Sequence, residues 1–110
     1  MSYDVWVEQG SGGPAPVRIG DWTYTCNVAP MLQAVIDHDG KTGLAALDGM
    51  TGEQAAFQLL LAAQLLGADP ERFDAMNPTN GWGSRETLVD ALGSLVDLCA
   101  AHLWATFRVQ

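Results

Sequence analysis

The chain has 110 residues, of which 48% are hydrophobic and 8% aromatic, enough to fill the core of one small domain. Thirteen Asp and Glu residues against five Lys and Arg residues give a net charge of −8, and the basic residues form no cluster. This balance disfavours nucleic acids and anionic membrane surfaces as partners, because both require a basic footprint. We therefore expect a single domain over residues 1–110 that binds neither nucleic acid nor membrane.

Two further features indicate a cytoplasmic protein. Residues 1–6 contain neither a basic region nor an apolar segment of signal-peptide length. The longest uncharged run, residues 54–68, is interrupted by glutamines and is too short to cross a bilayer. In a reducing compartment, Cys26 and Cys99 are expected to be buried free thiols rather than a disulfide.

Three segments alternate apolar and polar residues with the period of a β-strand: residues 3–8, 18–26 and 105–109. Residues 9–16 hold three glycines and two prolines, a composition that continues neither helix nor strand. The first two segments are therefore predicted to form a hairpin with a long loop, and the third to add another strand.

Helix-start signals separate these strands. Pro30 fits the first turn of a short helix that Asp39-Gly40 would end. Thr51 and Gln54 match a capping box, in which each side chain satisfies a backbone N–H group of the other residue. A longer helix is therefore expected to run from there to residue 66.

The C-terminal half contains two more helix signals. Residues 69–76 predict a short helix, and Ser84 is a good N-cap for a last helix whose apolar residues recur at intervals of three and four through Leu103. The predicted fold class is α+β. We expect a small three-stranded, mainly antiparallel sheet, built from both chain ends and the middle strand, with three to four helices packed on one face.

The segment 76–85 has the composition of a binding loop, because it sets a tryptophan among glycines and asparagines just before a helix. Free N–H groups at the helix start, with an arginine beside them, would favour a small anionic, nucleotide-like ligand. The alternative is a rigid structural turn, in which the same residues only shape and cap the chain. The candidate ligand-binding residues are Asn27, Asn77, Asn80, Trp82, Ser84 and Arg85.

The middle helix predicts a second kind of surface, because residues 57–66 are apolar on nearly all sides. A domain this small has little core in which to surround such a helix, so a homo-oligomer is predicted beside ordinary burial. Leu59 and Leu66 lie seven residues apart on one side and are the candidate interface residues. The opposite side carries Phe57, Leu60, Leu61 and Leu65, and one of the two sides would face the core.

Chemical motifs are sparse. Cys99 and His102 stand three apart on the last helix without a second pair of ligands, so no catalytic residue, metal ligand or cofactor is assigned. No phosphate-binding loop, nucleophile elbow or dinucleotide fingerprint occurs. Acidic residues share one face of the same helix, either as a negative stripe for a basic protein or as an ordinary solvated face. They are Glu86, Asp90 and Asp97.

Five segments carry a resemblance to a known family: residues 3–5, 25–31, 47–49, 77–84 and 101–109. Together they resemble small proteins encoded by actinobacterial phages and their hosts, a family without an assigned activity. The resemblance covers nearly the whole chain and rests chiefly on the Asn-Pro-x-Asn-Gly-Trp-Gly run. It implies this fold and a phage or prophage source, and it supplies no catalytic residues. The chain departs from the family in residues 57–66, where charges are expected.

Three functional hypotheses follow. The first is a non-enzymatic phage-type accessory protein in the host cytoplasm that sequesters a small anionic ligand or masks a host protein, in a counter-defence or host-takeover role. The second is an acidic inhibitor or immunity-type protein that covers a basic surface, for which the net charge is the support. The third is a small hydrolase or transferase that uses Asp48 or Asp74.

Overall fold

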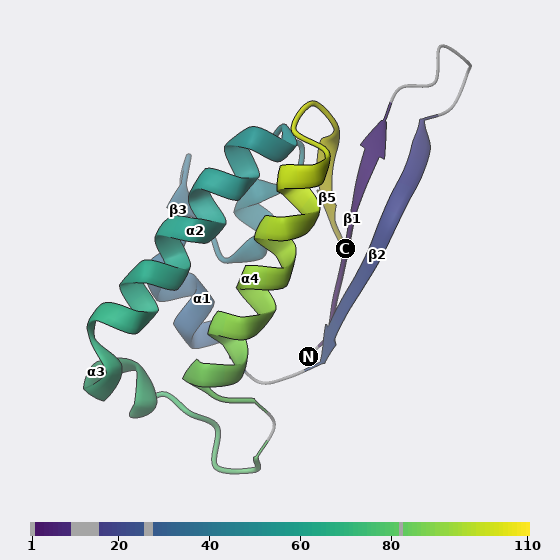
Figure 1. The fold of residues 1–110 in the computed structure, drawn as a ribbon. Helices are drawn as coiled ribbons and strands as arrows, with labels where there is room; N and C mark the ends of the chain where they lie inside the picture. Colours follow the sequence, from purple (N-terminus) through teal and green to yellow (C-terminus); the bar gives the residue numbers. More distant parts are fainter. Residues whose placement is uncertain (1, 10–15, 26–27, 82) are drawn as a thin grey trace.

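The structure, a computed structural model, describes residues 2–9, 16–25, 28–81 and 83–110. It has two layers, a three-stranded antiparallel sheet and a layer of helices on one face of that sheet (Figure 1). This confirms the predicted α+β class and the sheet built from both chain ends and the middle strand. In sheet order, the strands are β2 (Val17–Thr25), β1 (Ser2–Gln9) and β5 (Thr106–Val109).

Two long helices form most of the second layer, and they run side by side in opposite directions (Figure 1). The predicted capping box at the first of them is present, because the Gln54 N–H donates to Thr51 Oγ1 and the Thr51 N–H donates to Gln54 Oε1. Ser84 caps the second, as predicted, and exchanges equivalent bonds with Thr87. The helices are α1 (Ala29–Val35), α2 (Gly52–Ala68), α3 (Pro70–Asp74) and α4 (Arg85–Ala101).

The helix predicted to end at Asp39-Gly40 ends earlier. Ile36 is already extended, and β3 (Asp37–His38) pairs with β4 (Lys41–Thr42) in a two-residue hairpin. Asp39 and Gly40 form its turn with φ of 52° and 77°. Asp-Gly suits a tight hairpin because both of its residues tolerate positive φ. A 3-10 helix, η1 (Leu44–Leu47), follows in a segment for which no element was predicted.

The core lies between the sheet and the helices. Val5 and Val7 of β1 are fully buried, as the strand alternation predicts, and they meet Phe107 of β5 and the inner side of α2 and α4. In the interior of β2, Gly20 has a φ of 63° and lies where the pairing with β1 shifts register between Val5 and Val7. A Cβ atom at Gly20 would collide with Leu98 of α4, so glycine allows the helix to approach the strand.

Candidate functional site

The predicted ligand loop connects α3 to α4 at one end of the helical layer (Figure 1). Its turn depends on Gly81 and Gly83, which have φ of 76° and 99°. Asn77, Ser84 and Arg85 are brought together at the start of α4, and Asn80 is exposed in the same loop. Two further candidates, Asn27 and Trp82, lie outside the described residues.

The polar groups at the start of α4 bind one another. Asn77 Oδ1 accepts the backbone N–H of Arg85 at 2.8 Å, and Arg85 Nε donates to Asp74 Oδ1 at 2.9 Å. The Ser84 hydroxyl accepts the Thr87 N–H at 3.2 Å. These bonds use donors that an anionic ligand would need, and the Arg85 side chain is only 16% exposed. The described part of the loop therefore has the geometry of a helix cap.

The two carboxylates considered for catalysis also have partners within the chain. Asp48 Oδ1 accepts the backbone N–H of Val109 at 3.0 Å and lies 3.4 Å from Arg108 Nε, so it links the turn after η1 to β5. Asp74 pairs with Arg85 at the α3–α4 connection. Both carboxylates join elements of the fold.

Cys99 is fully buried and free, as predicted, whereas Cys26 lies outside the described residues. Burial raises the pKa of the Cys99 thiol to about 11, which keeps it protonated and unreactive near neutral pH. Among the described residues, no three His, Cys, Asp or Glu side chains are grouped so that they could hold a metal ion. Every buried side chain in this part of the chain is apolar.

The middle helix divides into two sides, but the roles assigned to them must be corrected. Leu59 and Leu66, named as interface residues, are 0% exposed and belong to the core. Both leucines belong to one core cluster with side chains of α1, α4, β1 and β5. Neither leucine is available to a partner.

The opposite side of α2 is exposed instead, and we call it the apolar face. Phe57 is 66% exposed, and three leucines are each exposed over more than two-fifths of their surface. Their spacing of three and four residues makes one continuous stripe along the helix. Contiguous exposed apolar side chains of this kind usually mark a contact site. The apolar face consists of Phe57, Leu60, Leu61 and Leu65.

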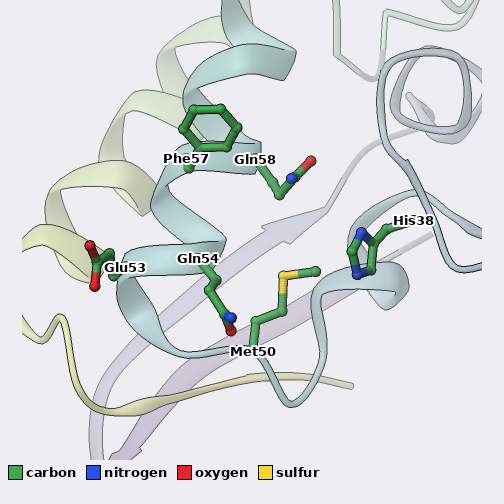
Figure 2. A pocket seen from close by; sticks show the side chains of 6 residues that line it. All are labelled: His38, Met50, Glu53, Gln54, Phe57 and Gln58. Carbon is green, nitrogen blue, oxygen red and sulfur yellow. The ribbon is translucent and has the colours of Figure 1, made fainter.

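A hollow of about 480 Å³ lies between this side of α2 and the β3–β4 hairpin (Figure 2). Figure 2 shows Phe57 and Gln58 projecting from α2, with His38 across from them on β3 and Met50 below. Glu53 and Gln54 complete the lining. The Gln54 side chain is held by the capping box, so the hollow has a fixed polar edge and an aromatic wall shared with the apolar face.

The structure exposes a tryptophan for which the sequence predicts no role. Trp104 is 82% exposed, and Leu103, expected to continue the buried stripe of α4, is 41% exposed. The helix ends at Ala101, and the Glu53 N–H donates to Leu103 O, which fixes the turn against the start of α2. Leu103 and Trp104 lie beyond the last residue of α4, so they are outside its buried stripe. A sequence signal that ended the helix at Ala101 would have predicted the exposure of both side chains.

Two surfaces thus stand out in the described part of the chain, the closed cap before α4 and the apolar face with its adjoining hollow. No helix there is long and apolar enough to cross a membrane. Comparison with protein-family models, curated proteins and solved structures finds no match for this chain.

Proposed function

We propose that this chain is a non-enzymatic accessory protein of phage or prophage origin that binds and masks a protein in the host cytoplasm. The apolar face of α2 is the contact surface, and its exposure is the observation that carries the proposal. The phage origin and the counter-defence or host-takeover role are supported by the resemblance of the sequence. A masking protein needs only a stable fold and a complementary surface.

Masking a protein has more support than sequestering a small anion. An anion at the start of α4 would compete with Asp74 for Arg85 and with Asn77 for the first N–H group of the helix. Those internal bonds are at ordinary hydrogen-bond distances and would have to be replaced. The apolar face requires no such rearrangement, because its side chains are already exposed in the single chain.

Three parallel purifications from an actinobacterial host lysate test this function. Wild-type protein and a Leu60→Gln, Leu61→Gln variant serve as baits, and native mass spectrometry measures what each one holds. A Val17→Gln, Leu103→Gln variant is the control, because it changes two exposed apolar residues outside the apolar face. We expect wild type and control to hold the same host protein in fixed stoichiometry, and the Leu60/Leu61 variant to lose it.

Two results would overturn the proposal. One is an identical set of proteins on all three baits. The other is a small molecule that copurifies with wild type and is lost on Arg85→Ala, which would support ligand sequestration. The homo-oligomer predicted from the sequence would use this same face, and the measured mass of the wild-type protein alone reports it.

A further inference from the structure

The apolar face of α2 has an acidic neighbour. Glu86, Asp90 and Asp97 are exposed on α4, and their spacing of four and seven residues places them on one side of that helix. We call them the acidic row. The helices α2 and α4 lie side by side in opposite directions, so the acidic row lies on the helix next to the one that carries the apolar face (Figure 1).

Contacts on α4 establish where the acidic row lies. The Thr87 Oγ1 is 3.1 Å from the hydroxyl of Tyr24 on β2, and Leu98 packs against the same strand at Gly20. The flank of α4 that carries Thr87 and Leu98 therefore faces β2, and the opposite flank faces α2.

The flank toward α2 carries Val89 and Val96, which are partly buried against the core. Asp90 and Asp97 follow these valines by one position, about 100° further around the helix. The acidic row thus lies on the solvent side of α4, about a quarter turn from the flank toward α2. A partner that lies on the apolar face could therefore contact the acidic row through long side chains on the edge of the partner nearest α4.

A second copy of this chain is a poor partner for the acidic row, because the chain has few free basic side chains. Of its five Lys and Arg residues, three are in ion pairs with its own carboxylates, and Arg72 lies over the ring of Phe73. Among the described residues, this leaves Lys41 outside such contacts, on the β3–β4 hairpin. A second copy would bring the same net charge of −8. The three pairs are Arg18–Asp21, Arg85–Asp74 and Arg108–Asp48.

From this arrangement we infer that the partner element is an amphipathic α-helix with an aliphatic face and a flank of Lys and Arg residues. It lies along α2, with its apolar side chains on Phe57, Leu60, Leu61 and Leu65 and its basic flank on the acidic row. These four residues stand at i, i+3, i+4 and i+8 on α2, a spacing that keeps them on one side of the helix, where the apolar side of another helix can lie. The inference rests on the proposed function and names the chemistry of the masked protein at the same surface.

Synthetic peptides test the inference on the full chain. The probe is a Leu/Lys helix of about five turns, close to the length of α2, and a Leu/Glu peptide of the same length is its control. Fluorescence anisotropy measures Kd for wild type and for three double variants. Leu60→Gln with Leu61→Gln alters the apolar face, and Asp90→Asn with Asp97→Asn neutralises part of the acidic row. Asp4→Asn with Glu8→Gln removes two charges from β1 as a matched control.

We expect the Leu/Lys peptide to bind wild type and the β1 control equally, and to bind the other two variants about tenfold more weakly or worse. Added salt should weaken the binding, and the Leu/Glu peptide should not bind. Equal binding of the Leu/Lys peptide to all four proteins would overturn the inference, since neither the apolar face nor the acidic row would then contribute to the binding. A second result would also overturn the inference. If the wild-type protein is a dimer that the Leu60→Gln, Leu61→Gln substitutions dissociate and the Leu/Lys peptide does not, then a second copy of the chain occupies the apolar face.

The failure of this inference is distinguishable from the failure of the proposed function. If a host protein binds through the apolar face and the Leu/Lys peptide does not, the partner is not a basic helix and the masking function stands. If the Leu60/Leu61 variant holds the same host protein as wild type, the masking surface itself is wrong, whatever the peptide does.

Discussion

Asn77 joins the loop before α4 to the helix that follows it. Its Oδ1 accepts the backbone N–H of Arg85, a donor that no residue of the helix can satisfy. We predict that Asn77→Ala lowers the free energy of unfolding by about 1 kcal/mol, the usual cost of losing one capping hydrogen bond. Urea denaturation measures the change, and Thr79→Ala, an exposed change in the same loop, should have little effect.

A ligand site would give the opposite result. If Asn77→Ala keeps the stability of wild type and loses a bound small molecule, then Asn77 serves a ligand and the bond to Arg85 is secondary. The structure favours the first outcome, because both Asn77 and Arg85 are partly buried and each has a hydrogen-bond partner within the chain.

Cys99 makes stability depend on pH in the alkaline range. The unfolded thiol has its ordinary pKa of 9.0, and burial raises the pKa of the folded thiol to about 11. Between these values the folded protein holds a proton that the unfolded chain releases. The contribution of Cys99 to stability is therefore complete below about pH 9 and is lost as the pH rises towards 11.

Chemical denaturation across this range, in a Cys26→Ser background, measures the effect. We predict that stability falls less steeply with pH in Cys99→Ala than in the parent protein, although the variant is less stable at neutral pH because it leaves a cavity. Tyrosine and lysine titrate in the same range, so the difference between the two proteins is the relevant quantity. Parallel pH profiles would show that the folded and unfolded thiols ionise alike.

The start of α2 packs closely against the end of α4 through Gly52. A Cβ atom there would collide with the backbone carbonyl groups of His102 and Cys99, which have little freedom to move. We predict that Gly52→Ala costs about 1–3 kcal/mol, as other overpacked sites do. Gly67, near the other end of α2, has nothing within 4 Å of its Cβ position, so Gly67→Ala should add about 0.5–1 kcal/mol.

Thermal unfolding of the two variants compares both ends of one helix with the same substitution. The predicted signs are opposite, so a general effect of alanine on helix propensity cannot produce both results. A stable Gly52→Ala variant would mean that α2 shifts away from α4 at little cost. That result would also weaken the account of how the turn containing Trp104 is held.

The sequence predicts elements well where a local rule determines them. Thr51 and Gln54 specify their cap by side-chain chemistry, and the alternation around Val5 and Val7 specifies a strand with one buried face. The β3–β4 hairpin does not follow from the sequence pattern, because Ile36 continues the apolar spacing of α1. In the structure Ile36 is also buried, but its backbone is extended and the helix has already ended. Asp39-Gly40 is typical of the end of a helix, and the same dipeptide equally suits a tight hairpin turn.

The candidate surfaces were harder to predict than the elements. Periodicity separates Leu59 and Leu66 from Leu60 and Leu61, yet it does not say which pair faces the core, because both sides of the helix are equally apolar. That choice depends on the packing of α2 against β5 and α4, which involves residues distant in sequence. The partners of Arg85 also depend on tertiary structure, since Asp74 lies on another helix.

Across the whole molecule, charge is unevenly balanced. The net charge is −8, and three of the five basic side chains are in ion pairs with the chain's own carboxylates. The short axes of the molecule measure 25 and 23 Å, so carboxylates on opposite sides are close enough to repel one another at low ionic strength. Unfolding moves these charges apart and relieves the repulsion.

We therefore predict that the midpoint of thermal unfolding rises as NaCl increases from roughly 0.01 to 0.15 M, because the screening length falls from about 30 to about 8 Å. Screening also weakens the three ion pairs, but each pair has at least one exposed partner and contributes little, whereas the uncompensated acids are more numerous. Asp90→Asn with Asp97→Asn should raise the midpoint at low salt and reduce its dependence on salt, since Asp90 and Asp97 have no basic neighbour on their face of α4 among the described residues. A midpoint that falls with NaCl would mean that the three ion pairs outweigh the repulsion. The acidic row would then be an ordinary solvated face, without a mutual repulsion that a basic partner could relieve.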